Sequence, residues 1–214
     1  MIVECYGLPG AGKSTLVQEL VKRQVCASVP KKVTRSLGAV FLVQHPFFTF
    51  RYLGVLIAES ARTHTWQLVR FKLAVLLDTV SKIEYVRRHN TSKSVFLLDE
   101  GIAQRLLSLC ETEKSPEWYT QLLRPFRKSL VVLHIVYKGH TAENVQVGSR
   151  RAMLGEAYGK KWKKTIFNNY TSITICLHQA NVRECYYKRN VSRAEDEYQS
   201  LISCIEHCKQ NVEL

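Results

Sequence analysis

A glycine-rich segment near the start of the chain has the residue types and spacing of a phosphate-binding loop. It follows residues 2–6, which are apolar apart from Glu4, and has the pattern G-x-x-x-x-G-K-S. Glycines let successive backbone N–H groups point at one anion, and the helix that follows adds the positive end of its dipole. The lysine of this motif neutralises the β- and γ-phosphates, and its serine hydroxyl is a ligand for Mg²⁺. The residues expected to contact a nucleoside triphosphate are Gly7, Pro9, Gly10, Ala11, Gly12, Lys13, Ser14 and Thr15.

A second candidate site closes another apolar run. Residues 94–98 read SVFLL and are followed by Asp99, Glu100 and a glycine, which is typical of a buried parallel strand with acidic groups at its end. Ligands collect at the carboxyl ends of parallel strands, where the loop after the first strand also lies. A carboxylate there binds Mg²⁺ or accepts a proton from an attacking hydroxyl. We therefore expect Asp99 and Glu100 to face the nucleotide, with Ser14 and Asp99 as the Mg²⁺ ligands.

Arginine and lysine gather in residues 148–164. Arg150 and Arg151 lie in a glycine-flanked segment, which favours a mobile lid that brings positive charge to a transferring phosphoryl group. We expect this lid at about residues 139–164, with both arginines taking part in catalysis. The lysines that follow are interpreted as a basic surface.

The elements that must position these groups follow from the hydrophobic pattern. Continuous apolar runs predict central strands at residues 2–6, 94–98 and 130–137. A more polar strand is expected at 182–188 and a short, charged edge strand at 32–36.

Helical spacing predicts a helix from Lys13 to about residue 24, a long helix at 66–88 and a shorter one at 102–109. A capping-box pattern at Ser192 opens a final helix. The apolar residues 39–58 are interrupted by a proline and an arginine, so we reject a transmembrane helix there and expect an aromatic-rich amphipathic helix.

Length and composition limit the classes of protein to which the chain can belong. The 214 residues suit one domain, and 46% hydrophobic residues are normal for a globular protein. The net charge of +13 favours anionic partners such as nucleotides, phosphorylated metabolites, nucleic acid or an acidic membrane surface, and charge alone does not choose among them. We do not favour the nucleic acid or the membrane.

The seven cysteines form no regular framework, and no signal-peptide pattern precedes the first strand. We therefore expect reduced thiols in a cytoplasmic protein. Cys204, His207 and Cys208 share one side of the last predicted helix and would suit zinc, but without an evident fourth ligand we favour packed thiols with a surface histidine.

The loop at residues 7–14, the strand that ends Leu98-Asp99-Glu100-Gly101 and the later arginine pair resemble the small P-loop kinases of the thymidylate kinase and deoxynucleoside kinase type. The resemblance implies an α/β, three-layer P-loop NTPase fold: a five-stranded parallel sheet of order 2-3-1-4-5 with helices on both faces. It also implies ATP as the donor and in-line phosphoryl transfer helped by Mg²⁺.

The chain departs from those families at one position. Their acidic residue at the end of the third strand is followed by arginine, whereas here Asp99 matches the acid and Glu100 stands where the arginine would be. A carboxylate there repels an acceptor phosphate, so we expect an uncharged nucleoside or sugar-like acceptor ahead of a nucleoside monophosphate. Arg105, about one helical turn later, is the expected substitute. The aromatic residues before the acidic strand are expected to pack in the core ahead of lining an acceptor pocket, and Phe48 and Tyr52 are the candidates for the pocket.

The first functional hypothesis is a kinase that moves the γ-phosphoryl group of ATP to a hydroxyl of a small molecule. The alternative is a P-loop ATPase that acts as a switch or assembly factor with a nucleic-acid, protein or membrane partner, in which Glu100 orients a water. The absence of an Asn-Lys-x-Asp motif counts against a GTPase. A third hypothesis is a nucleotide-binding module whose basic surface docks on a membrane.

Overall fold

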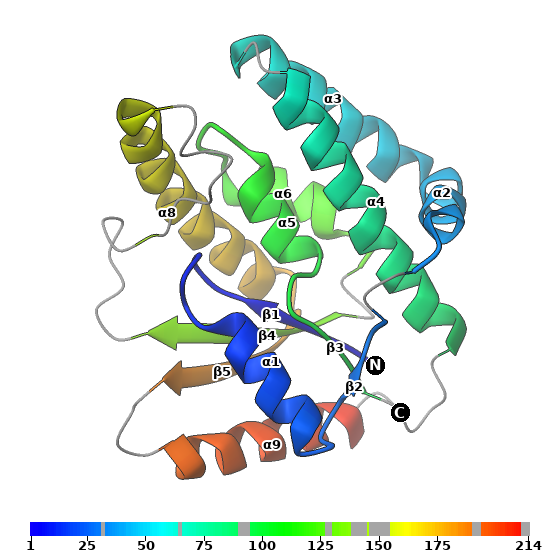
Figure 1. The fold of residues 1–214 in the computed structure, drawn as a ribbon, viewed down its shortest axis with the longest axis vertical. Helices are drawn as coiled ribbons and strands as arrows, with labels where there is room; N and C mark the ends of the chain where they lie inside the picture. The colour runs from blue at the N-terminus through cyan, green and yellow to red at the C-terminus, as the bar shows by residue number, and fades with distance from the viewer. Residues whose placement is uncertain are drawn as a thin grey trace.

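A parallel sheet lies at the centre of the computed structural model (Figure 1). The structure describes residues 1–30, 33–63, 66–89, 95–126, 130–137, 145, 155–189 and 194–210. Within these ranges the sheet has five strands, all paired in parallel, in the order β2-β3-β1-β4-β5. The strands are β1 Ile2–Tyr6, β2 Ala27–Ser28, β3 Phe96–Leu98, β4 Leu130–Tyr137 and β5 Arg183–Arg189.

Helices cover both faces of the sheet and make three layers. Figure 1 shows α1 and α9 on one face, and α4, α5 and α8 on the other, with α2, α3 and α6 packed outside them. The described helices are α1 Lys13–Lys22, α2 Arg35–Gln44, α3 Pro46–Thr63, α4 Trp66–His89, α5 Ile102–Leu109, α6 Pro116–Leu123, α8 Glu156–Gln179 and α9 Ala194–Gln210.

The strand residues alternate between two hydrophobic cores. In β1, Val3 and Cys5 belong to the core beneath α1 and α9, whereas Ile2 and Tyr6 belong to the larger core beneath α4, α5 and α8. Successive side chains of a strand point to opposite faces, so a strand covered on both sides must be apolar at nearly every position. This burial explains the continuous apolar runs in the sequence.

Most of the expected elements are confirmed. Strands β1 and β4 and helix α5 have the predicted bounds, and α4 covers the predicted long helix. The proline that interrupts the apolar residues 39–58 lies at a boundary between two helices, because α2 ends at Gln44 and α3 begins at Pro46. No single described helix has the length and hydropathy to cross a membrane; only α2 joined to residues 46–59, with a bend of 106° between them, meets those two criteria.

The edge strand predicted at residues 32–36 is wrong. The edge position is taken by β2 at Ala27–Ser28, and α2 already begins at Arg35. Packing accounts for the helix: a Cβ at Gly38 would lie 2.5 Å from Ser81 Oγ and 2.8 Å from Leu77 O, so only glycine lets α2 approach α4 this closely. That contact is not visible in local propensity.

The lid predicted at residues 139–164 is corrected at its C-terminal end. From Glu156 onward this segment is the start of α8, whose Trp162 and Ile166 are buried in the larger core. A regular helix held by such side chains is part of the scaffold. Arg150 and Arg151 lie outside the described residues, so their role stays a prediction.

The expectation that every cysteine is a reduced thiol is wrong for one pair. Cys185 of β5 and Cys204 of α9 form a disulfide, and Cys208 Sγ lies 3.8 Å from Cys185 Sγ. The free thiols among the described residues are those of Cys5, Cys26, Cys110, Cys176 and Cys208. The sulfur cluster therefore joins Cys185 to Cys204 and Cys208, in place of the set with His207 that the sequence suggested.

Candidate active site

The segment between β1 and α1 has the backbone of an anion-binding loop. Gly10 and Gly12 have φ angles of 92° and 84°, in the left-handed region that side chains rarely adopt, and Gly12 is the N-cap of α1. Gly7 has no room for a side chain, because a Cβ there would lie 2.9 Å from the carbonyl oxygen of Ile135 in β4. The predicted order of strand, loop and helix is confirmed.

Lys13 folds beneath this loop. Its ammonium donates to the carbonyl oxygens of Gly7 at 2.9 Å and Leu8 at 3.1 Å, and the residue is only 8% exposed. Burial lowers the pKa of Lys13, whereas the nearby negative charges of Glu100 and Asp99 act to raise it. The ammonium is therefore bonded to the loop and is also influenced by the charges of the two carboxylates that follow β3.

Gln104 and Glu4 tie the start of this loop to α5. The backbone N–H of Gly7 donates to Gln104 Oε1 at 3.1 Å, and the backbone N–H of Gln104 donates to Glu4 Oε1 at 2.8 Å. Glu4 is fully buried at the N-terminus of α5, where the positive end of the helix dipole favours a carboxylate. This contact explains why β1 contains one charged residue, Glu4. A single carboxylate in an otherwise apolar strand is the feature of the sequence that points to such a contact.

Gly101 leaves the space that the Glu4 carboxyl group fills. A Cβ at Gly101 would overlap Glu4 Cδ and Oε2, so we expect Gly101→Ala to lower the free energy of unfolding by about 1–3 kcal/mol. Gly54→Ala is the matched control, because a Cβ at Gly54 in α3 meets nothing within 4 Å, and it should raise the stability by about 0.5–1 kcal/mol. Chemical denaturation measures both changes, and equal stability of the two variants would contradict this account.

Glu4 should make stability depend on pH. Burial raises the pKa of Glu4 from an ordinary 4.5 to about 7, although the N–H groups of Gln104, Ala103 and Ile102 act to lower it. Between these pH values the folded chain holds a proton that the unfolded chain has released, so stability falls as the pH rises through this window. The shift corresponds to roughly 3 kcal/mol.

The measurement is chemical denaturation at several pH values for the wild type and Glu4→Gln. The variant should lack the fall between pH 4.5 and 7, and its stability relative to the wild type should therefore increase across this range. A stability difference that is independent of pH would show that Glu4 does not titrate there.

Ser14 and Asp99 line one pocket of about 370 Å³ between α1 and the end of β3. Both residues are exposed, and Gln18 also belongs to the lining. A hydroxyl and a carboxylate are oxygen ligands of the kind that Mg²⁺ takes, and Mg²⁺ usually keeps several waters beside a few such ligands. The donor set therefore fits the predicted magnesium site.

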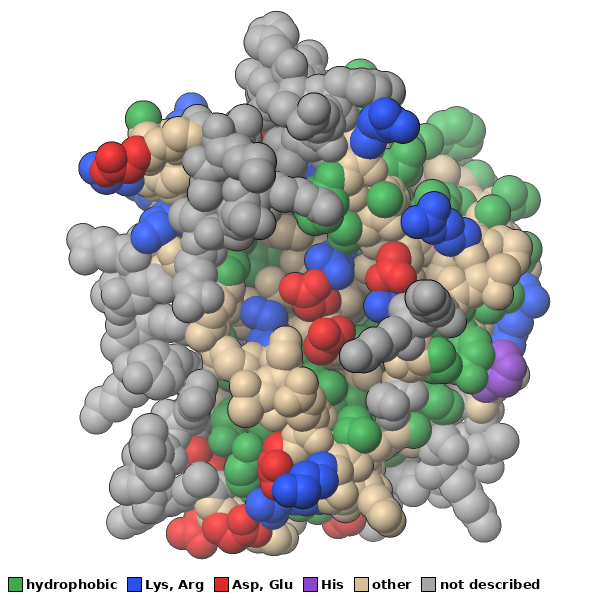
Figure 2. All heavy atoms as spheres, in the orientation of Figure 1, with side chains coloured by type: hydrophobic (Ala, Val, Ile, Leu, Met, Phe, Trp, Pro, Cys, Tyr) green, Lys and Arg blue, Asp and Glu red, His purple; other side chains and the backbone are tan. Residues whose placement is uncertain are grey.

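Glu100 turns toward a different pocket and forms an ion pair with Arg105. Glu100 Oε2 lies 2.5 Å from an Arg105 guanidinium nitrogen, and Arg105 Nε donates to Thr79 Oγ1 at 3.3 Å. In Figure 2, acidic and basic side chains gather around the hollow at the centre of the visible face. The pocket has a volume of about 320 Å³ and is lined by Pro9, Tyr52, Phe71, Lys72, Val75, Glu100, Gln104, Arg105, Ser108, Leu109, Trp162 and Ile166.

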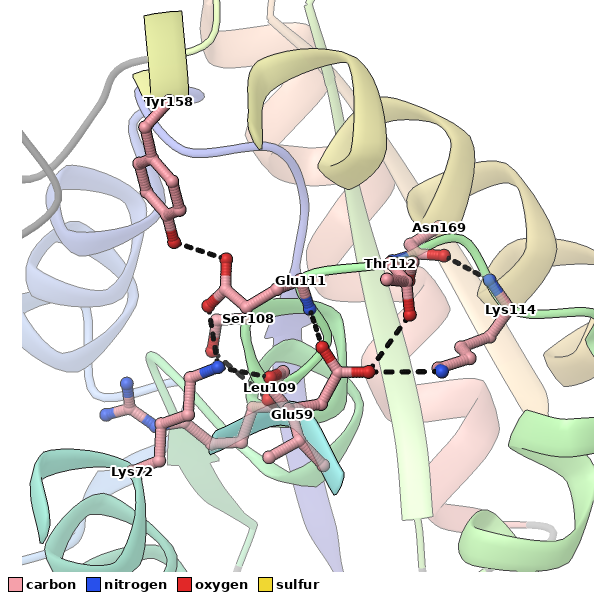
Figure 3. Close-up of polar contacts among 10 residues, drawn as sticks. Glu59, Lys72, Ser108, Leu109, Glu111, Thr112, Lys114, Tyr158 and Asn169 are labelled. Atoms are coloured by element: carbon pink, nitrogen blue, oxygen red, sulfur yellow. Dashed lines mark hydrogen bonds and ion pairs between the residues drawn. The ribbon is translucent and has the colours of Figure 1, made fainter. Parts of the chain in front are cut away.

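Lys72 of the pocket lining belongs to a buried ion pair (Figure 3). Lys72 Nζ donates to Glu111 Oε1 at 2.6 Å and to the carbonyl oxygen of Leu109 at 2.5 Å, and both charged side chains are 6% exposed. Tyr158 at the start of α8 donates its hydroxyl to Glu111 Oε2 at 2.5 Å. These contacts thus join α4, the segment after α5, and α8.

Glu59 of α3 holds the same segment from the other side, as Figure 3 shows. Its carboxylate accepts from the Glu111 backbone N–H and the Thr112 hydroxyl, both at 2.9 Å, and lies 3.1 Å from Lys114 Nζ. Asn169 of α8 accepts from the Lys114 N–H and donates to the Thr112 carbonyl oxygen. The fold tolerates the burial of the Glu59 and Glu111 carboxylates because each of their oxygens has a hydrogen-bond or ion-pair partner.

The structure places only some of the predicted acceptor-site residues in the same pocket. Arg105 and Tyr52 line the pocket beside Glu100, and their role toward an acceptor stays a prediction. Phe48 does not: it is buried against Phe41 and Phe126 and borders another pocket. Sequence reasoning missed Phe71, Lys72 and Trp162, because residues on helices α4 and α8 reach the pocket only after the helices have packed.

Comparison with known proteins gives distant likenesses. No family model matches the chain, and no curated protein matches it by sequence. Among solved structures, the deoxyadenosine kinase of M. mycoides with bound dATP is similar to this chain at 13% identity and a TM-score of 0.49, covering 96% of this chain and 100% of the kinase. The same enzyme with dCMP and a flexible dCDP gives 13% identity and a TM-score of 0.47, over 99% and 100% of the two chains. The chemistry of the site is therefore argued from this chain's own residues.

Proposed function

We propose that this protein is a phosphotransferase that moves the γ-phosphoryl group of Mg-ATP to a hydroxyl group of a small molecule. The observation that carries the proposal is the pocket that lies between Pro9 of the loop and the Glu100–Arg105 ion pair. Its volume of about 320 Å³ is within the usual range for a small-molecule site. A loop that positions a triphosphate only for hydrolysis has no need of such a pocket beside it.

The nucleotide side of the site needs positive charge and a metal. Loop N–H groups and the Lys13 ammonium would neutralise the β- and γ-phosphates, and Ser14 and Asp99 would hold Mg²⁺. When bound, Mg²⁺ reduces the charge on the phosphates and fixes their orientation. Lys13 is already held at the loop by the carbonyl oxygens of Gly7 and Leu8, and a bound triphosphate would take over as the partner of its ammonium.

The acceptor side supplies orientation. The Glu100 carboxylate accepts a hydrogen bond from the attacking hydroxyl and takes its proton as the phosphoryl group is transferred. Arg105 keeps that carboxylate in place through their 2.5 Å contact. Tyr52, Phe71 and Trp162 offer apolar and aromatic surfaces for a flat base or one face of a sugar.

Charge in the pocket favours an uncharged acceptor. Lys72 and Arg105 are the cations of the described lining, and each is paired with a carboxylate, Glu111 or Glu100. A phosphate on the acceptor would have to compete with these carboxylates for the cations. We therefore place a nucleoside or a sugar ahead of a nucleoside monophosphate.

The test measures ADP release from Mg-ATP with nucleosides, nucleoside monophosphates and sugars offered in turn. We expect release that depends on a nucleoside or a sugar, and Glu100→Gln should reduce it while ATP binding stays within a few-fold. Glu197→Gln in α9 is the control and should behave as the wild type.

Three results would argue against the proposal. Release that is independent of any acceptor would assign the loop to an ATPase, and binding without turnover would assign it to a nucleotide-binding module. A clear preference for a nucleoside monophosphate would show that the role given to Glu100 is wrong.

A further inference from the structure

Helices α2 and α3 present large apolar side chains to solvent. Phe47, Phe50 and Ile57 of α3 are 90%, 75% and 67% exposed, and Val43 at the end of α2 is 80% exposed. The spacing of the three α3 residues puts them on one side of the helix, with Gly54 between them. Figure 2 shows apolar side chains along the edge of the molecule where Figure 1 places α2 and α3. We call Val43, Phe47, Phe50 and Ile57 the apolar row.

The opposite side of α3 packs in the protein core. Phe48, Tyr52 and Leu56 are 3%, 1% and 3% exposed and pack in the larger core. Removing α3 from the protein would uncover these side chains, so α3 does not become a membrane-spanning segment without loss of the fold. The apolar row is therefore available only to something that approaches from outside.

A basic pocket adjoins the apolar row. It has a volume of about 620 Å³, and its lining includes Phe47 together with His45, Arg51 and Arg124 but no carboxylate among the described residues. Residues 20–58 contain no Asp or Glu. Glu117, one turn before the lining residue Gln121 on α6, stands outside the lining. An anionic group is the natural occupant of this pocket.

We propose that the apolar row and the basic pocket together dock on an anionic lipid bilayer. Phe47, Phe50 and the aliphatic side chains enter the boundary between headgroups and acyl chains, while Arg51 and Arg124 contact headgroup phosphates. Interfacial helices bind in this way, by burying an apolar side to about 5–10 Å and pairing basic residues with anionic lipids. The net charge of +13 strengthens the attraction.

A second copy of the chain fits this surface less well. A two-fold contact brings the same patch of both copies together, so Arg51 and Arg124 would face the same cations of the partner copy. No carboxylate of the described lining would neutralise them. A lipid surface supplies the missing negative charge, and this reasoning is independent of what the protein phosphorylates.

The test is sedimentation of the full chain with vesicles of phosphatidylcholine alone or with added phosphatidylserine. The wild type should bind the anionic vesicles, and the double variant Phe47→Ser, Phe50→Ser should lose about tenfold or more of its partition coefficient. Arg51→Gln with Arg124→Gln should lose the preference for anionic vesicles. Ile175→Ser, at an apolar side chain of α8 that is 42% exposed, is the matched control and should bind as the wild type.

Thermal unfolding of each variant checks that the fold is kept, which is expected because all the changed side chains are exposed. The proposal is overturned if the wild type ignores anionic vesicles or if the phenylalanine variant binds them equally well. It is also overturned if ultracentrifugation finds a dimer that the phenylalanine variant abolishes while vesicles are not bound. That result would make the row an interface between copies.

Discussion

Lys13→Ala should reduce acceptor-dependent ADP release by about a hundredfold or more. The Lys13 ammonium is the cation held beneath the described loop, and it is fixed there by the carbonyl oxygens of Gly7 and Leu8. Removing the ammonium takes away the positive charge that neutralises the phosphates where their negative charge is greatest. An exposed side chain that rotates toward the phosphates does not replace an ammonium that was already in position. Steady-state kinetics with saturating Mg-ATP measure the loss in kcat.

The matched control is Lys22→Ala, which removes an exposed lysine from the last turn of the same helix. It should retain wild-type turnover. Thermal unfolding must show that Lys13→Ala is still folded, because the substitution also leaves two loop carbonyl oxygens without their donor. Turnover within a few-fold of the wild type in a folded Lys13→Ala protein would remove the basis of the proposed function.

Asp99→Asn should lower turnover on a similar scale, by about a hundredfold, and raise the Mg²⁺ concentration needed for half-maximal activity. Asp99 shares its pocket with Ser14, and in the proposed function its carboxylate holds the metal against the phosphates. Asparagine keeps the shape of the side chain but removes the charge, which isolates the electrostatic contribution.

Asp196→Asn, at an exposed aspartate in the first turn of α9, is the control and should not alter the Mg²⁺ dependence. ATP binding by Asp99→Asn should remain within a few-fold of the wild type when it is measured without turnover. An unchanged Mg²⁺ requirement would assign Asp99 to structure and leave Glu100 as the functional carboxylate at the end of β3.

Local sequence was sufficient to predict the loop between β1 and α1. The loop is continuous in the chain, and its glycine positions are set by backbone angles that the φ values of Gly10 and Gly12 now display. Strands β1 and β4 were predictable because burial on both faces forces an unbroken apolar run. The carboxylates after β3 followed from the rule that parallel strands end at one edge of a sheet.

Two predictions of secondary structure were wrong because contacts between distant parts of the chain, and not the local sequence, determine the structure there. Strand β2 has only two residues, too few to carry a pattern, and α2 depends on the close approach of Gly38 to α4. The predicted lid was extended to about residue 164, whereas Trp162 and Ile166 make the segment from Glu156 a packed helix.

Most of the lining of the pocket beside Glu100 was decided by the tertiary structure. Tyr52, Lys72 and Trp162 come from α3, α4 and α8, and their spacing in the sequence is indistinguishable from that of ordinary core positions. Helical periodicity predicts which side of a helix is apolar, but not whether an apolar residue faces the core, a cavity or solvent. Phe47 and Phe48 are neighbours in the chain, yet one is exposed and the other is buried, because only the packing of α3 against the core fixes the direction of each.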